Sequence, residues 1–191
     1  MRHRMLRACS IVVCLVVAGT APAPAQTKLL RFPDVHGDRI VFTYGGDLWL
    51  SRASGGSAWR LTAHPGQELF ARFSPDGEWI MFVSTRENGS QVWKLPVHGG
   101  EAVQVTDFSM GVSDPRWLPD GKHILFYTDV WPECGADSDC NKELADDMDG
   151  GPVHAHIADD LLYRHWTFYK DGKRFHTFIY NTETEEYTDL T

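Results

Sequence analysis

A sequence unit that recurs at a fixed offset of 44 residues restricts this chain to a few architectures. Four landmarks keep the offset, and the two copies of each have the same residue types. They are Trp49 and Trp93, Gly55-Gly56 and Gly99-Gly100, Thr62 and Thr106, and the triplets Pro75-Asp76-Gly77 and Pro119-Asp120-Gly121. Periods in the forties, with several short strands in each unit, are typical of β-propeller blades.

Each landmark has a local role in a four-stranded antiparallel unit. Pro sets φ for a turn, Asp bonds back to the backbone and Gly accepts positive φ, so each Pro-Asp-Gly triplet predicts a turn between a first and a second strand. The predicted second strands are rich in β-branched and aromatic residues, which favours strands that are buried on both faces. They are 39–44, 79–84 and 123–128, and third strands are predicted at 47–52 and 91–97.

The sequence therefore predicts an all-β fold, a partial β-propeller of about three four-stranded antiparallel blades. The predicted blades cover about 29–66, 67–110 and 111–191, and an acidic loop or short helix at 129–160 interrupts the third. Natural propellers have about four to eight blades, because each sheet face is buried against the next blade and the ring closes. We expect further blades in a longer polypeptide, or blades supplied in trans.

The first 25 residues read as a secretory signal peptide rather than as part of the fold. Three arginines precede a short apolar run, and small residues end at Ala25. Such a leader predicts a periplasmic or secreted protein with no membrane attachment after cleavage. Its removal changes the net charge from −8 to −11, since the three arginines leave and no acid does. A surface this acidic repels phosphate backbones, so nucleic acid is excluded as a partner.

Two cysteines remain in the mature chain, Cys134 and Cys140, with five residues between them. In an oxidising compartment this pair favours a local disulfide over a metal site, because neither C-x-x-C spacing nor a second cysteine pair is present. The segment 129–160 holds ten acids and one base. A calcium loop starting at Asp137 lacks the Gly and the final Glu that such loops need, so a solvated acidic loop is the favoured interpretation.

Four histidines near this segment leave a zinc site as an open alternative. They are His154, His156, His165 and His176. Their spacing is unconventional for zinc, so hydrogen bonds to the blade are the favoured role and we expect neither a metal nor a cofactor. The sequon Asn88-Gly89-Ser90 is interpreted in the same way as a hairpin turn rather than as a glycosylation site.

The repeats resemble the blades of TolB-type and tricorn-peptidase-type propellers, in which F-S-P-D-G and D-L-W, followed by G-G and L-T, recur. From residue 91 onward the chain is more specifically similar to the propeller of bacterial serine peptidases of the prolyl oligopeptidase family, in the acylaminoacyl- and dipeptidyl-peptidase-like branch. The segments that carry this second resemblance are WPECGADSDCNKE (131–143) and HIADDLLYRHWTFYKDGKRFHTFIY (156–180).

The resemblance implies a propeller that admits short peptides to an α/β-hydrolase domain, which would carry the serine in G-x-S-x-G. The nearest string here, Gly111-Val112-Ser113-Asp114-Pro115, lacks the closing Gly, so no catalytic residue is assigned and the chain alone is expected to be inactive. The expected partners are that hydrolase domain, the remaining blades and a peptide substrate. Arg164 and Tyr163 are hypothesised to hold a substrate terminus, since Arg binds carboxylates bidentately.

Two other functions stay open at this point. A TolB-like propeller would bind protein partners without catalysis, and a tricorn-like propeller would feed a different catalytic domain.

Overall fold

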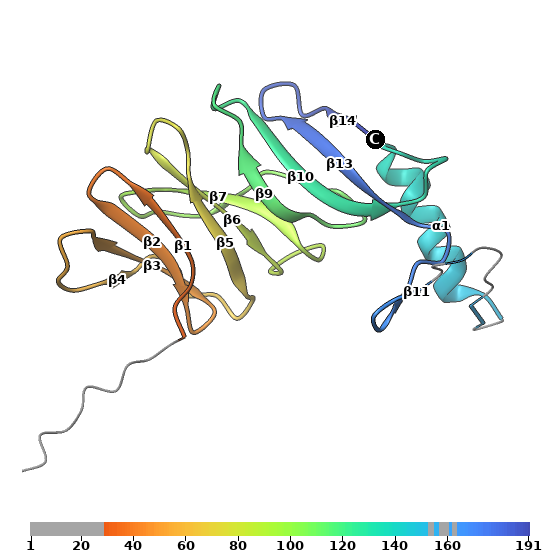
Figure 1. Ribbon diagram of the computed structural model, residues 1–191, viewed down its shortest axis with the longest axis horizontal. Helices are drawn as coiled ribbons and strands as arrows, with labels where there is room; N and C mark the ends of the chain where they lie inside the picture. The colour runs from red at the N-terminus through yellow and green to blue at the C-terminus, as the bar shows by residue number, and fades with distance from the viewer. Residues whose placement is uncertain (1–28, 153–154, 157–160, 162–163) are drawn as a thin grey trace, which may run out of the picture.

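The computed structural model describes residues 29–152, 155–156, 161 and 164–191. Three twisted sheets stand side by side in chain order, from the first sheet at one end to the third at the other (Figure 1). Each consists of four antiparallel strands, and this arrangement confirms the predicted partial β-propeller.

The strands of each sheet are hydrogen-bonded in sequence order. The first sheet contains β1 (Arg31–His36), β2 (Arg39–Tyr44), β3 (Asp47–Arg52) and β4 (Trp59–Arg60). The second contains β5 (Glu68–Phe73), β6 (Trp79–Ser84), β7 (Gln91–Pro96) and β8 (Val103–Gln104). The third contains β9 (Ser113–Trp117), β10 (His123–Val130), β13 (Arg174–Asn181) and β14 (Tyr187–Asp189). Between β10 and β13 lie α1 (Ser138–Gly150) and the hairpin of β11 (Arg164–His165) and β12 (Phe168–Tyr169).

Burial along the second strands shows which sheet has neighbours on both sides. In β6 the five residues after Trp79 are all buried, whereas β2 and β10 alternate between buried and less buried positions. The prediction that all three second strands are buried on both faces is therefore wrong for β2 and β10. Only the second sheet lies between two others, so only its strand is covered twice.

Two hydrophobic clusters fill the spaces between neighbouring sheets. The cluster between the first and second sheets includes Val41, Ile80 and Phe82, and the cluster between the second and third includes Met81 and Phe126. Successive residues of β6 thus point into different clusters, as the two-residue period of a strand requires.

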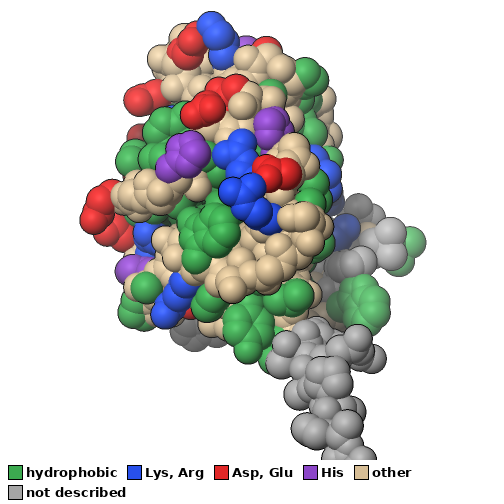
Figure 2. Space-filling view, turned by 90° about the vertical axis from the view of Figure 1, so that its left-hand side faces the viewer, with side chains coloured by type: hydrophobic (Ala, Val, Ile, Leu, Met, Phe, Trp, Pro, Cys, Tyr) green, Lys and Arg blue, Asp and Glu red, His purple; other side chains and the backbone are tan. Residues whose placement is uncertain are grey.

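The free face of the first sheet is partly apolar. Ile40, Phe42 and Tyr44 alternate with the buried positions of β2 and are half-exposed. The view onto the side of the molecule that bears the first sheet shows hydrophobic side chains exposed among charged ones (Figure 2). This face of the first sheet is therefore less covered than either face of the second sheet.

A threonine at the end of each outer strand ties that strand to the one before it. Thr62 Oγ1 accepts a hydrogen bond from Leu48 N, and Thr106 Oγ1 accepts one from Val92 N, both at 2.9 Å. Thr191 Oγ1 accepts the equivalent bond in the third sheet, from Thr177 N at 3.0 Å. The repeated threonine therefore satisfies a backbone donor where the short outer strand ends.

Replacing Thr106 by Val tests this role. Thr106 is 1 % exposed and its hydroxyl also donates to Gln91 Oε1 at 2.8 Å. The variant keeps the shape but leaves the Val92 N–H without its acceptor, so we expect a loss of about 1–3 kcal/mol in the local free energy of unfolding. Hydrogen exchange at the Val92 amide measures it. Thr188→Val, at an exposed position, is the control and should change stability by less than about 0.5 kcal/mol.

The Pro-Asp-Gly turns close as predicted, with the aspartate holding the backbone. Asp120 Oδ1 accepts from Lys122 N at 2.9 Å, and Asp76 Oδ1 accepts from Glu78 N at 3.0 Å. The bond from Lys122 N, followed by the bond to the His123 side chain, lowers the pKa of Asp120 from 3.8 to about 2. The pKa of Asp76 is also lowered, first by its bond to the Ser74 hydroxyl and then by the bond from Glu78 N.

These lowered pKa values predict an acid dependence of the turns. A carboxylate whose pKa falls on folding contributes stability that is present above its ordinary pKa of 3.8 and is lost as the pH falls towards 2. The side-chain carboxyl signal of Asp120 in an NMR titration should therefore have its midpoint near pH 2. A midpoint near the ordinary value would contradict the assigned bonds.

The insertion in the third sheet begins two residues later than expected, because β10 continues to Val130 and its residues Asp129 and Val130 pair with Phe175 and Arg174. Residues 138–150 form a helix, which is the second of the two structures expected for the insertion, and not the solvated loop. Asp137 caps it by accepting from Cys140 N at 3.0 Å, which satisfies one of the free N–H groups of the first turn.

Candidate functional site

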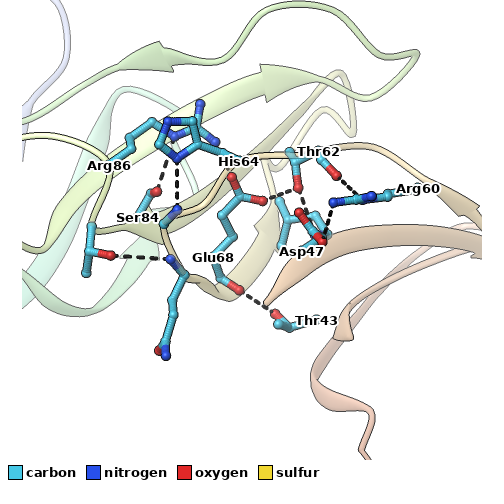
Figure 3. A network of polar contacts seen from close by, with 12 residues as sticks. Thr43, Asp47, Arg60, Thr62, His64, Glu68, Ser84 and Arg86 are labelled. Carbon is cyan, nitrogen blue, oxygen red and sulfur yellow. Dashed lines mark hydrogen bonds and ion pairs between the residues drawn. The ribbon is translucent and has the colours of Figure 1, made fainter. Parts of the chain in front are cut away.

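A fully buried carboxylate lies at the junction of the first and second sheets. Glu68 begins β5 and is 0 % exposed, and its side chain forms an ion pair with Arg86 and accepts a hydrogen bond from the Thr62 hydroxyl. Its backbone is tied to the first sheet as well. Thr43 Oγ1 donates to Glu68 O at 3.0 Å, and Glu68 N donates to Gly46 O at 2.9 Å (Figure 3).

Arg86 is held as firmly as its partner. Its guanidinium group lies 4.8 Å from the Trp93 ring centroid and 5.5 Å from that of Phe82, and its Nε donates to Ser84 Oγ at 3.2 Å. Only 13 % of its side chain is exposed. Glu68 and Arg86 both belong to the second sheet, and the bonds from Thr62 and Thr43 connect Glu68 to the first sheet, so the network fastens one blade to the next.

A side-chain pair that includes an aspartate recurs beside the threonine in two sheets, with the aspartate on the third strand in one sheet and on the outer strand in the other. In the first sheet Asp47 on β3 pairs with Arg60 on β4 at 2.7 Å. In the third sheet the corresponding strands carry His176 and Asp189, whose Nδ1 and Oδ2 atoms are 2.6 Å apart. The pairs fasten the outer strand in both places, which assigns His176 a structural contact within the blade.

The insertion is anchored by a disulfide and a buried amide. Cys134 and Cys140 are joined, with Cα atoms 5.5 Å apart. Asn141 is 0 % exposed; its Oδ1 accepts from Trp131 N at 3.1 Å, and its Nδ2 donates to the carbonyls of Gly135 and Asp137. Asp137 and Asn141, which would be ligand positions 1 and 5 of the calcium loop considered above, are thus occupied in capping α1 and in holding the loop before it.

Two of the four histidines considered for zinc form pairs with aspartates instead of meeting one another. His156 Nδ1 lies 2.7 Å from Asp171 Oδ1, and His156 stacks on Tyr169 with ring centroids 3.8 Å apart. His176 pairs with Asp189, as described above. His154 and the side chain of His165 lie outside the described part of the chain. No group of three potential metal ligands occurs among the described residues.

Arg164 lies on the exposed hairpin that follows α1. Its Nε donates to Trp166 O at 2.7 Å, and its guanidinium group lies 5.5 Å from the Tyr169 ring centroid. Tyr163, the other residue hypothesised to hold a substrate terminus, lies outside the described residues. The guanidinium group is thus oriented by the hairpin itself, at the surface of the insertion.

Ser113, in the string nearest to a hydrolase nucleophile motif, is the first residue of β9. A nucleophile elbow needs a sharp turn from a strand into a helix, and β9 instead pairs with β10 in a sheet.

Among the described residues, no helix is long and apolar enough to cross a membrane. Sequence reasoning missed the Glu68–Arg86 pair; its one available signal was an acid directly before an apolar strand.

Three four-stranded sheets, each tied internally by a threonine bond and the first two linked through Glu68, define a β-propeller module with an insertion in the third blade. Residues 27–136 match the model of the tricorn protease N-terminal β-propeller domain, so the chain belongs to that family. Tricorn protease homolog 1 of Streptomyces coelicolor is 37 % identical over 106 residues, which are 55 % of this chain and 10 % of that protein.

Solved structures with the same fold include a peptidase and a TolB protein. The acylaminoacyl peptidase of Pyrococcus horikoshii superposes with a TM-score of 0.59 at 17 % identity, over 85 % of this chain and 24 % of that one. TolB from Acinetobacter baumannii gives a TM-score of 0.55 at 18 % identity, over 84 % of this chain and 32 % of that one. The chain spans about a tenth of the length of two curated relatives that it matches, the tricorn protease homologs 1 and 2 of Streptomyces coelicolor.

Proposed function

We propose that this chain is the N-terminal, substrate-gating propeller of a secreted or periplasmic serine peptidase that hydrolyses short peptides. The observation that carries the proposal is its membership of a propeller family named for a protease, over residues 27–136. The catalytic serine, its base and the oxyanion hole would belong to an α/β-hydrolase domain outside this chain, as in the prolyl oligopeptidase family that residues 131–180 resemble. The chain alone would be inactive.

Gating follows from the architecture that the proposal assumes. A ring of blades encloses a channel, and a channel admits an extended peptide while it excludes a folded protein. Glu68 fits this role, because it accepts a hydrogen bond from Thr62 and one from Thr43 of the first blade while Arg86 of its own blade pairs with its carboxylate. The insertion between β10 and β13 adds a hairpin and a helix at one end of the third blade (Figure 1).

The test uses the full-length natural protein. A fluorophosphonate probe should label one serine, and peptide mapping should place it in G-x-S-x-G, followed in the chain by the Asp and the His of the triad. A five-residue peptide should be cleaved, while the same sequence within a folded protein should stay intact. Equal cleavage of the two would contradict gating, and absence of labelling together with absence of cleavage would contradict the peptidase assignment.

Export is a separate part of the proposal. Residues 1–25 would be removed, so N-terminal sequencing of the mature protein should begin at Gln26. Recovery of the intact N-terminus from the cytoplasmic fraction would contradict it.

A tricorn-like peptidase is the second candidate, favoured by the family model itself. The labelled serine would then lie in a catalytic domain without the G-x-S-x-G elbow, so the same mapping experiment separates the two.

A further inference from the structure

The dipeptide Asn88-Gly89 lies in the loop 85–90, which connects β6 to β7. Every residue of this loop is described, and no backbone hydrogen bond joins one residue of the loop to another. A side chain holds the loop instead, because Gln91 Nε2 donates to Asn88 O at 3.0 Å. The backbone at Asn88 and Gly89 can therefore change its dihedral angles without breaking a backbone hydrogen bond within the loop.

The amide nitrogen of Gly89 is available as a nucleophile. Among the described residues, none accepts a hydrogen bond from it. Glycine has no side chain to shield this nitrogen, and a Cβ at Gly89 would meet no atom within 4 Å, so the space beside it is open to water. Asn88 is exposed as well. The loop thus brings together a labile side-chain amide and an unhindered nitrogen in the next residue.

We propose that Asn88 is a site of spontaneous deamidation. The Gly89 nitrogen loses its proton and attacks Cγ of Asn88; a C–N bond forms, the bond from Cγ to Nδ2 breaks, and ammonia leaves with a proton from water. The product is a cyclic imide of the backbone. Water then adds to one or the other of its carbonyl carbons and opens the ring, which leaves aspartate or isoaspartate in place of Asn88. The net reaction converts an amide and water to a carboxylate and ammonium, with no oxidation or reduction.

Deamidation places a new carboxylate against Asp107. In the unmodified chain Asn88 Nδ2 donates to Asp107 Oδ1 at 3.1 Å. The backbone N–H of Asp107 donates to the hydroxyl of Tyr187 in the third sheet, also at 3.1 Å, so Asp107 lies where the second blade meets the third. Loss of the donor and gain of a like charge turn an attraction into a repulsion at this point. The modification therefore loosens the linker between the two blades as the protein ages.

Peptide mapping of the full-length natural protein, after incubation in mildly alkaline or mildly acidic buffer, tests the modification. The peptide that contains Asn88 should acquire isoaspartate, detected by labelling with an isoaspartate methyltransferase. The reaction should be faster in the alkaline buffer, because the attacking nitrogen must lose its proton. The peptides that contain Asn141 and Asn181 are internal controls and should stay unmodified, since a residue with a side chain follows each of them and Asn141 is also 0 % exposed.

Two single replacements separate the role of the dipeptide from that of the sequon. Gly89→Ala shields the nitrogen and should prevent detectable conversion over the same period. Ser90→Ala removes the sequon but keeps Asn88-Gly89, so conversion should continue. A sugar attached to Asn88, or conversion of Asn88 no faster than that of Asn181, overturns the proposal.

Asn88→Asp tests the effect on the linker without waiting for the reaction. The Val112 amide donates to Ser90 O at 2.7 Å, and its hydrogen exchange should become about two- to fivefold faster, a change of the size expected for an exposed charge pair. The double variant Asn88→Asp/Asp107→Asn is the matched control: it again sets one amide beside one carboxylate and should restore the slower exchange. Unchanged exchange in Asn88→Asp, or no recovery in the double variant, overturns the loosening of the linker. None of these measurements depends on peptidase activity.

Discussion

Replacing Glu68 by Ala should cost about 3–5 kcal/mol of local stability at the junction of the first two blades, since removing one member of a buried pair leaves the other charge uncompensated. Arg86 would remain between Phe82 and Trp93 with 13 % of its side chain exposed and no carboxylate beside it. Hydrogen exchange at the amides of β5 and β6 measures the loss without requiring the whole protein to unfold in one step.

An exposed ion pair provides the matched control for Glu68. Asp38 pairs with Arg52, and the two side chains are 64 % and 63 % exposed. Water screens such a pair, so Asp38→Ala should cost only about 0–1 kcal/mol. A similar loss in the two variants would show that the buried pair contributes no more than a surface one.

The double variant Glu68→Leu/Arg86→Met separates two explanations of a large loss. If the cost comes from an unpaired buried charge, removing both charges should cost less than the sum of the single replacements. If the cost comes from lost packing, the single effects should add.

Local rules predicted the strands of this chain well. β2 and β6 coincide with the predicted second strands, and β3 with the predicted third strand at 47–52. These bounds could be predicted because Pro-Asp-Gly turns and β-branched runs act over a few residues. The burial of the same strands could not be predicted, because it depends on how many sheets stand beside each one.

The contacts between sheets could not be predicted from a single sequence. Glu68 meets Thr62 of the first blade because the chain turns between them, and no local pattern encodes that approach. Bulges in the first strands were also missed. Phe32 and Phe70 lie at φ 51° and 55°, although bulky residues rarely adopt such values, and their rings stand 4.2 Å apart. Nothing in their residue type signals a left-handed conformation.

Among the candidate site residues, too, local contacts could be predicted and contacts between distant segments could not. The disulfide partners Cys134 and Cys140 lie six positions apart, where spacing alone limits the alternatives. The bond from Asn88 to Asp107 needs β7 and β8 to be paired before the two residues can meet. Sequence reasoning therefore identified the turn at Asn88 and did not identify its partner.

Gly77→Ala should destabilise the protein much more than the same change at Gly121, although both glycines close a Pro-Asp-Gly turn. Gly77 lies at φ +72° and Gly121 at φ +68°, so left-handed backbone strain, about 1–2 kcal/mol, is common to both. A Cβ at Gly121 would meet only Pro75, at 3.9 Å, which is an ordinary contact. A Cβ at Gly77 would overlap the imidazole ring of His36.

The overlap matters because His36 belongs to the first sheet and Gly77 to the second. The His36 ring packs near Phe73, with centroids 5.8 Å apart, so moving it disturbs the contact between blades. Overpacking of this kind adds about 1–3 kcal/mol, which brings the expected loss at Gly77 to roughly 2–5 kcal/mol. Hydrogen exchange at β1 and β5 measures it. His36→Ala, combined with Gly77→Ala, should reduce the loss caused by the new methyl group to that of Gly121→Ala, because the ring that it strikes is gone. Equal losses at Gly77 and Gly121 with His36 intact would instead mean that the ring swings aside freely and does not help to position the first blade on the second.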